Sequence, residues 1–289
     1  MITDDKTNFL YLSDLLPRKK IFFESFTNLL ASLQVRYELL PFTKDIWCRD
    51  YMPIQVEQSK FVRFKYEPDY LQNNTHISSQ TNNKQVCRAI EIAAIESHIK
   101  IDGGNVITGS DWVILTDKIF KENPTHTKLG LIKELENLFG CKIIIIPREP
   151  GDYTGHADGM VRYYDDNTLL INNYKPDDKP DFQRKLMREL KGNGFQLIKI
   201  PYNPYKNVNR ESADGLYINY LKMDSLTILP IFGMKEDDLT ARFFEQLFPG
   251  RPLKTIDARE VSKEGGVLNC ITWNIKTARR PKQKKALMP

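Results

Sequence analysis

The chain has 289 residues, of which 41% are hydrophobic and 27% are charged, a composition typical of soluble globular proteins. No stretch approaches the roughly 20 apolar residues of a membrane-spanning helix, and the first residues lack the basic and apolar segments of a signal peptide. The four cysteines stand far apart, which excludes a zinc-ligand spacing and a disulfide framework. We therefore expect a cytoplasmic protein with reduced thiols and without a membrane partner.

The net charge of +5 is concentrated at the C-terminus. Residues 276–289 carry six basic and no acidic side chains, so subtracting six from +5 leaves −1 for residues 1–275. We expect residues 1–275 to form a single domain and residues 276–289 to be a basic, disordered tail. Binding of the tail to nucleic acid is the alternative, which the slightly acidic body disfavours.

Helical periodicity appears five times along the chain, over residues 19–34, 84–95, 128–140, 179–193 and 236–247. Each helix is followed by a short strand-like run: YELLPF, SHIKI, KIIIIP, QLIKIP and LKTID. Three of these runs lead into hairpin-like segments that open with Asp102, Asp158 and Asp214, at intervals of 56 residues, and one more interval reaches Cys270. A fixed period of this length indicates repeated structural modules.

Five such modules closed around an axis would form an α/β ring resembling a propeller, with its helices outside. The junction between each short strand and its hairpin would then face the centre. One polar pocket on the axis would gather Asp50, Asp102, His156, Asp158 and Cys270. An ordinary α/β sheet with unrelated turns is the alternative.

The residues near these junctions suit nucleophilic chemistry on a cation. His156 and Asp158 are two residues apart, so in a strand they would point to the same face. The Cys270 thiol, preceded by two glycines, could attack an electrophilic carbon while His156 transfers protons. Two carboxylates, Asp50 and Asp158, repel each other unless a cation lies between them, and a planar guanidinium suits that position.

Each of these residues also has a structural interpretation. Cys270 could be a packing cysteine, and Asp50 could pair locally with Arg49. A metal site built from His156, Asp158 and Cys270 is disfavoured because no second histidine or ligand pair lies near them in the sequence.

Five motifs in order resemble those of the agmatine deiminase and bacterial peptidylarginine deiminase family of guanidino-modifying enzymes. They are WCRDYMP (47–53), DGGN (102–105), GHADGMVR (155–162), YIN (217–219) and GGVLNCIT (265–272). The resemblance spans residues from about 40 to 275. It implies a five-bladed, pseudo-symmetric α/β-propeller (pentein) with an axial active site. It also implies hydrolysis of a guanidino group to a ureido group plus ammonia, without a metal or an organic cofactor.

The resemblance also implies residue roles. Cys270 would be the nucleophile that forms a covalent thiouronium, and His156 the general acid and base. Asp50 and Asp158 would grip the guanidinium. The other substrate-binding residues would be Trp47, Asn219 and Asp102, with Arg49 supporting the site structurally.

Three departures from the family pattern bear on the substrate. Asp102 stands where glutamate is usual, Met52 where a small residue is common, and Asn269 where histidine is frequent. Agmatine is the expected substrate, and an arginine derivative or an arginine-containing peptide is the alternative, as is an inactive guanidinium-binding protein. The segment 61–70 offers both basic and acidic side chains for the far end of a substrate: Arg63, Lys65, Glu67 and Asp69. A homodimer and a monomer both remain open.

Overall fold

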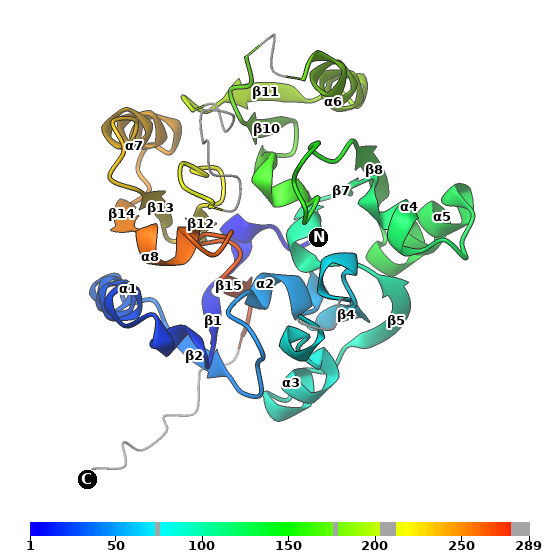
Figure 1. The fold of residues 1–289 in the computed structure, drawn as a ribbon, viewed down its shortest axis with the longest axis horizontal. Helices are drawn as coiled ribbons and strands as arrows, with labels where there is room; N and C mark the ends of the chain where they lie inside the picture. The colour runs from blue at the N-terminus through cyan, green and yellow to red at the C-terminus, as the bar shows by residue number, and fades with distance from the viewer. Residues whose placement is uncertain (73–75, 176–178, 203–211, 279–289) are drawn as a thin grey trace.

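The computed structural model describes residues 1–72, 76–175, 179–202 and 212–278. Apart from its first three residues, the basic tail lies outside the described part of the chain. Within that part, fifteen strands form five separate three-stranded sheets. Figure 1 shows the sheets arranged around a common centre, with helices at the rim. The predicted α/β class and the five repeated modules are therefore confirmed, and the alternative of one ordinary sheet is wrong.

Each sheet is built in the same way, as the second one shows. Strands β3 (Ile54–Glu57) and β4 (Lys60–Lys65) form an antiparallel pair. Helix α3 (Asn83–Ala89) then leads to β5 (Ile95–Lys100), which pairs parallel with β4.

The next three sheets repeat this order of two strands, a helix and a strand. The third sheet has β6 (Ile107–Thr108), β7 (Trp112–Thr116), α5 (Lys128–Phe139) and β8 (Lys142–Ile146). The fourth has β9 (Val161–Asp165), β10 (Thr168–Ile171), α6 (Pro180–Gly192) and β11 (Gln196–Lys199). The fifth has β12 (Leu221–Lys222), β13 (Thr227–Ile231), α7 (Asp237–Leu247) and β14 (Leu253–Asp257).

The remaining sheet joins the two ends of the chain. Strand β15 (Thr272–Ile275) pairs antiparallel with β1 (Phe9–Ser13). Helix α1 (Lys20–Ser32) then leads to β2 (Tyr37–Leu40), which pairs parallel with β1. Because the first strand of this sheet comes from the far end of the sequence, the ring is closed by backbone hydrogen bonds.

Three of the outer helices, α1, α5 and α6, each bury a narrow stripe of apolar side chains at four-residue spacing. In α5 the buried residues are Leu131, Leu135 and Phe139. The side chain of Thr127 caps its first turn, and Gly140 ends it in the left-handed conformation with φ of 69°. One buried stripe with a polar remainder is expected of a helix that packs on a sheet and faces water. Among the described residues, no helix has the length and apolarity needed to cross a bilayer.

One predicted helix is shorter than its periodicity suggested. Helix α3 ends at Ala89 rather than residue 95. Glu91 has a φ of 58°, a left-handed conformation that an α-helix cannot continue through. The chain then turns directly into β5, so the apolar residues after Glu91 belong to a turn and a strand.

Short helical segments complete the described structure. They are α2 (Cys48–Tyr51), α4 (Lys118–Glu122) and α8 (Arg259–Ser262), with the 3₁₀ turns η1 (Asp4–Lys6), η2 (Leu16–Arg18), η3 (Asp69–Leu71), η4 (Ile77–Ser79), η5 (Gly103–Asn105) and η6 (Ala157–Gly159).

Candidate active site

A short turn precedes the first strand of every sheet, and these turns carry the candidate site. Segments α2, η5 and η6 precede β3, β6 and β9, and turns within residues 214–219 and 268–271 precede β12 and β15. All seven residues predicted for the site lie on or next to these turns: Trp47, Asp50, Asp102, His156, Asp158, Asn219 and Cys270. The repeat therefore brings together residues that are far apart in the sequence.

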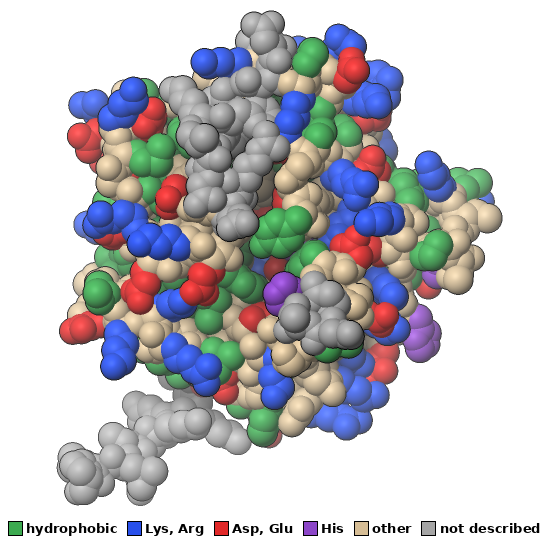
Figure 2. All heavy atoms as spheres, viewed as in Figure 1, with side chains coloured by type: hydrophobic (Ala, Val, Ile, Leu, Met, Phe, Trp, Pro, Cys, Tyr) green, Lys and Arg blue, Asp and Glu red, His purple; other side chains and the backbone are tan. Residues whose placement is uncertain are grey.

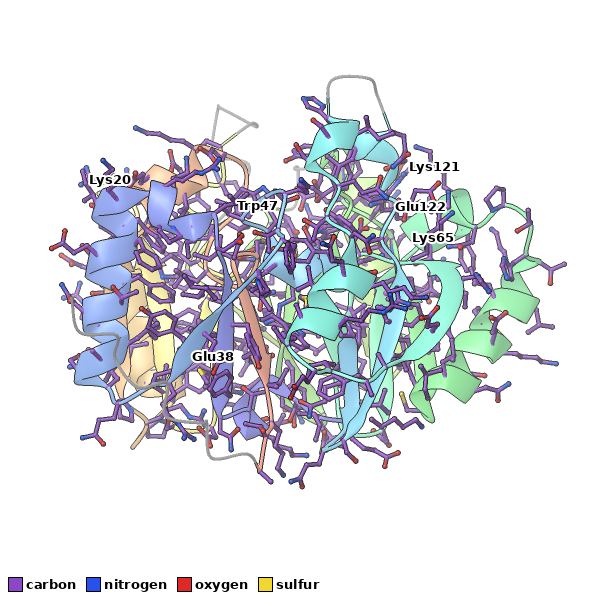
Figure 3. The ribbon with its side chains drawn as sticks, turned by 90° about the horizontal axis from the view of Figure 1, so that it is seen from below. Lys20, Glu38, Trp47, Lys65, Lys121 and Glu122 are labelled. Carbon is purple, nitrogen blue, oxygen red and sulfur yellow. The ribbon has the colours of Figure 1, made fainter. Side chains whose placement is uncertain are left out.

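Six of these seven residues line one cavity of about 640 Å³; they are Trp47, Asp50, His156, Asp158, Asn219 and Cys270. Figure 2 shows the face on which this cavity opens, with a hollow near its centre. In side view, Trp47 lies near the middle of the molecule, at the same end as Lys121 and Glu122 (Figure 3). Asp102 is outside the described lining and lies behind His156, so its contact with substrate stays a prediction.

Neutral amide groups hold the half of the cavity that contains Cys270. The amides of Asn219 and Asn269 donate hydrogen bonds to Asp158 Oδ2 at 3.0 and 2.7 Å. Asn219 Oδ1 accepts the backbone N–H groups of Asn269 and Cys270 at 3.1 and 3.3 Å. The Cys270 Sγ lies 3.3 Å from that same oxygen and 3.8 Å from Asp158 Oδ2. The Asp158 carboxyl group is thus fixed beside the thiol by neutral donors.

This environment keeps the thiol protonated when the cavity is empty. Burial raises the pKa of Cys270 well above its usual range, and the carboxylates of Asp158 and Asp50 raise it further. A cation placed between those carboxylates would lower the pKa again, because it favours the thiolate. Of the four cysteines, all of which are described, only Cys270 lines the cavity.

Charged groups hold the opposite half of the cavity, which contains His156. Its Nε2 lies 3.0 Å from Asp102 Oδ2, and its Nδ1 lies 3.7 Å from Asp50 Oδ1. Burial lowers the pKa of His156, but the charge of Asp50 and the hydrogen bond with Asp102 outweigh burial and raise the pKa to about 9. Burial raises the pKa of Asp50 to about 7, against the opposing charge of His156. The ring is therefore an imidazolium at neutral pH, ready to donate a proton.

Two glycines permit the close approaches in this site. A Cβ on Gly104 would lie 2.6 Å from both Asp50 Oδ1 and His156 Nδ1. A Cβ on Gly266 would lie 2.4 Å from the Trp47 ring. Gly266, which lies four residues before Cys270, therefore makes room for the ring of Trp47.

His156 caps η6 and Asp158 lies within it, so placing them on a strand was wrong although both still face the cavity. Arg49 has the expected structural contacts, because its Nε donates to the Asn269 carbonyl at 3.3 Å.

The segment after the first motif does not supply the basic groups considered for the far end of the substrate. Arg63 pairs with Glu96 at 2.6 Å and Lys65 pairs with Glu67, and neither basic residue is in the described lining. Lys65 lies toward the outer side of the molecule (Figure 3).

Two residues beside the reacting groups were not predicted as site residues. Asn269 appeared only as a departure from the family pattern, yet it holds Asp158. Lys118 contacts Asp102. The one sequence signal that could have identified Lys118 is its i, i+4 spacing from Glu122 on α4. Among the described residues, no group of three or more His, Cys, Asp or Glu side chains is arranged to hold a metal ion.

Known proteins resemble this chain in both sequence and structure. A curated relative from Mycoplasma mycoides, provisionally named an agmatine deiminase, is 24% identical over 223 residues, which are 65% of this chain and 61% of the relative. A relative from Streptomyces coelicolor with the same provisional name is 27% identical over 62% of this chain and 58% of its own length. The chain thus spans about three fifths of the length of these relatives.

The fold matches solved structures over almost the whole chain. The structure of an agmatine deiminase from C. jejuni has a TM-score of 0.76, with 19% identity and 95% coverage of both chains. That of DDAH from Pseudomonas aeruginosa has a TM-score of 0.59, with 14% identity, 93% coverage of this chain and 99% of the other. A family model described as Porphyromonas-type peptidyl-arginine deiminase matches residues 18–275. The chain therefore belongs to the Porphyromonas-type peptidyl-arginine deiminase family.

Proposed function

We propose that this protein hydrolyses a guanidino group to a ureido group and ammonia through a covalent intermediate on Cys270. The observation that carries this proposal is one cavity lined by a thiol, an imidazolium and two carboxylates: Cys270, His156, Asp50 and Asp158. The five sheets would then form a pseudo-symmetric α/β-propeller with its active site on the axis. Family membership and the fold of the neighbours support this assignment.

Substrate binding would itself activate the nucleophile. A guanidinium between Asp50 and Asp158 can donate paired N–H groups to both carboxylates. Its positive charge offsets the two carboxylates that raise the Cys270 pKa, so the thiol loses its proton to solvent water on binding. The resulting thiolate attacks the guanidinium carbon and forms a C–S bond.

His156 would act twice in the steps that follow. As an imidazolium it donates a proton to one amino group, and the C–N bond breaks to release ammonia, which leaves an S-linked thiouronium. The neutral ring then takes a proton from a water molecule whose oxygen attacks the same carbon. The C–S bond breaks and releases the Cys270 thiolate, while the hydroxyl on that carbon loses its proton to give the ureido carbonyl. The thiolate regains a proton from water when the product leaves, so protons and electrons balance without a redox step.

The charges around the rest of the cavity favour a substrate whose far end is cationic. Beyond Asp50 and Asp158, the described lining contains five more carboxyl groups and one lysine: Asp45, Glu149, Asp152, Asp214, Glu264 and Lys179. Burial raises the pKa of Asp45 to about 7, and Glu264 pairs with Lys19, so the excess of acidic over basic groups rests on Glu149, Asp152 and Asp214. A second positive charge is attracted by this environment, whereas the carboxylate of free arginine is repelled. Agmatine has an ammonium at its far end, and we therefore place it ahead of arginine and arginine-containing peptides.

Ammonia release from a panel of guanidino compounds tests this function. The panel is agmatine, arginine and a peptide with C-terminal arginine, each with the wild-type chain and with Cys270→Ser. We expect the highest kcat/KM for agmatine, a ureido product, and ammonia release by the variant that is about 10⁴-fold slower or more. Higher kcat/KM for the peptide would overturn the substrate, and no ammonia from any compound would overturn the reaction in favour of a guanidinium-binding protein.

A further inference from the structure

The half of the cavity that holds His156 is backed by a buried lysine. Lys118 Nζ lies 2.6 Å from Asp102 Oδ2, the same oxygen that lies 3.0 Å from His156 Nε2. Only 2% of the Lys118 side chain is exposed, and 2% of the Asp102 side chain. A buried ammonium is stable only when it is paired and hydrogen-bonded, so this contact is part of the architecture and not an incidental surface pair.

The surroundings fix this ammonium firmly. Glu122 Oε1 lies 3.2 Å from Lys118 Nζ, and the ring of Tyr70 lies 4.8 Å from it. Gly155, which directly precedes His156, has a φ of 64°, a left-handed conformation that favours glycine, and a Cβ there would lie 3.4 Å from the Lys118 stem, an ordinary contact. Helix α4 thus places the Lys118 ammonium beside Asp102, where it contacts the same carboxylate oxygen as His156. Figure 3 shows this helix through its labelled residues Lys121 and Glu122.

We propose that Lys118 is a positioning residue of the reaction, whose ammonium holds Asp102 and counterbalances the charge of that carboxylate on His156. This inference rests on the proposed function for its role in turnover, but the contact itself can be tested without a substrate. His156 must release a proton and later take one back, so neither form of the ring can be held too strongly.

The charges that face His156 explain why a counterbalance is needed. The groups that face it are Asp50 from α2, Asp102 before η5, Lys118 from α4 and the ring of Tyr70 from η3, whose centroid lies 6.1 Å from that of the imidazole. Among these, Asp50 and Asp102 favour the imidazolium, and Lys118 opposes it. Without Lys118, two carboxylates would hold the ring in its charged form and slow the step in which it accepts a proton from water.

Proton titration of His156 by NMR measures this effect directly. The chain has four histidines, so the His156 signal can be assigned from its loss in His156→Gln. The variant Lys118→Met/Glu122→Gln removes a cation and its neighbouring carboxylate together, and Glu122→Gln alone is its matched control. We expect the His156 midpoint to be higher in the double variant by about one pH unit or more, a tenfold change in proton affinity.

A surface lysine on the same helix provides the second control. Lys121 is 62% exposed and pairs with Asp69 at 2.7 Å, so Lys121→Met should leave the His156 midpoint unchanged. In turnover, the double variant should lower kcat more than kcat/KM and accumulate the covalent intermediate, with Glu122→Gln again as reference. An equal His156 midpoint in the double variant and Glu122→Gln would overturn the inference. A shifted midpoint in a protein that releases no ammonia would instead support the contact and overturn the proposed function.

Discussion

The two halves of the cavity hold their carboxylates by different means. On the Cys270 side, Asp158 is held by the neutral amides of Asn219 and Asn269. On the His156 side, Asp102 is held by an imidazole and an ammonium. Neutral donors fix a carboxylate without cancelling its charge, which leaves Asp158 free to attract a cation. Charged donors instead control how tightly a proton is held, which suits the group that transfers protons.

Removing the nucleophile should have the largest effect on the Cys270 side. In Cys270→Ser the hydroxyl has almost no anionic form near neutral pH, so kcat should fall by about 10⁴-fold or more. Steady-state ammonia release measures this. Cys141→Ser is the matched control, because that cysteine is outside the described lining and should leave kcat unchanged. Retained activity in Cys270→Ser would remove this residue from the mechanism.

Neutralising Asp50 or Asp158, the two carboxylates proposed to bind the guanidinium, should distinguish the two halves of the cavity. Asp50→Asn and Asp158→Asn each leave a guanidinium with one charged partner fewer, which costs about 2–5 kcal/mol, or roughly 30- to 5,000-fold in kcat/KM. Only Asp50→Asn should also lower the pH at which His156 titrates, because the charge of Asp50 raises the His156 pKa. A similar shift in Asp158→Asn would show that the halves are not distinct.

A single methyl group added at residue 104 should displace the side chains of Asp50 and His156 without unfolding the protein. In Gly104→Ala the new Cβ would lie 2.6 Å from both Asp50 Oδ1 and His156 Nδ1, and the two side chains must move. Misplacement on this scale costs about 100-fold in kcat/KM. Gly159 also lines the cavity, but a Cβ there has open space, so Gly159→Ala should have near-normal kinetics. Equal kinetics in both variants would contradict the geometry of this half.

Removing one of the amides that hold Asp158 should lower kcat/KM by less than the substitutions above. Asn269→Ala removes the 2.7 Å hydrogen bond to Asp158, and a hydrogen bond to a charged group is worth about 1.5–3 kcal/mol. We expect kcat/KM to fall roughly 10- to 150-fold while the pH at which His156 titrates stays constant. A shift of that pH would show that Asn269 also acts on the half of the cavity that contains His156.

The pH dependence of the free energy of unfolding should come from the half of the cavity that contains His156. The pKa of His156 is raised from 6.5 to about 9 in the folded state. Its stabilising contribution is therefore fully present below pH 6.5 and is lost as the pH rises through about 9. Urea unfolding between pH 6 and 9.5 should show this slope in Asn269→Ala and a weaker slope in His156→Gln. Identical slopes would contradict the raised pKa.

The sequence predicted most of the site because the site follows the repeat. The 56-residue interval led to Asp102, Asp158 and Cys270, and the turns before the first strands place all three near the centre. The length of helix α3 could not be predicted in the same way. Its apolar spacing continued beyond Glu91, and only the backbone conformation of that residue ends the helix.

The supporting contacts could not be predicted because they depend on packing between different modules. Lys118 lies on a five-residue helix, and only its i, i+4 spacing from Glu122 distinguishes it in the sequence from Lys121, an exposed lysine of the same helix. The role of Asn269 depends on Asp158, 111 residues away. A local pattern identifies the residue types in a motif, but the residues that hold a carboxylate in place become visible only in the folded chain.

The most direct test of a covalent mechanism is the mass of the enzyme during turnover. In the wild-type enzyme, ammonia leaves before water resolves the thiouronium, so an acid quench during turnover should trap the adduct on Cys270. After incubation with agmatine and an acid quench, we predict a mass increase equal to agmatine minus ammonia, mapped by peptide sequencing to Cys270. An adduct on Cys48, Cys87 or Cys141, or ammonia release with no adduct at any time, would contradict the account.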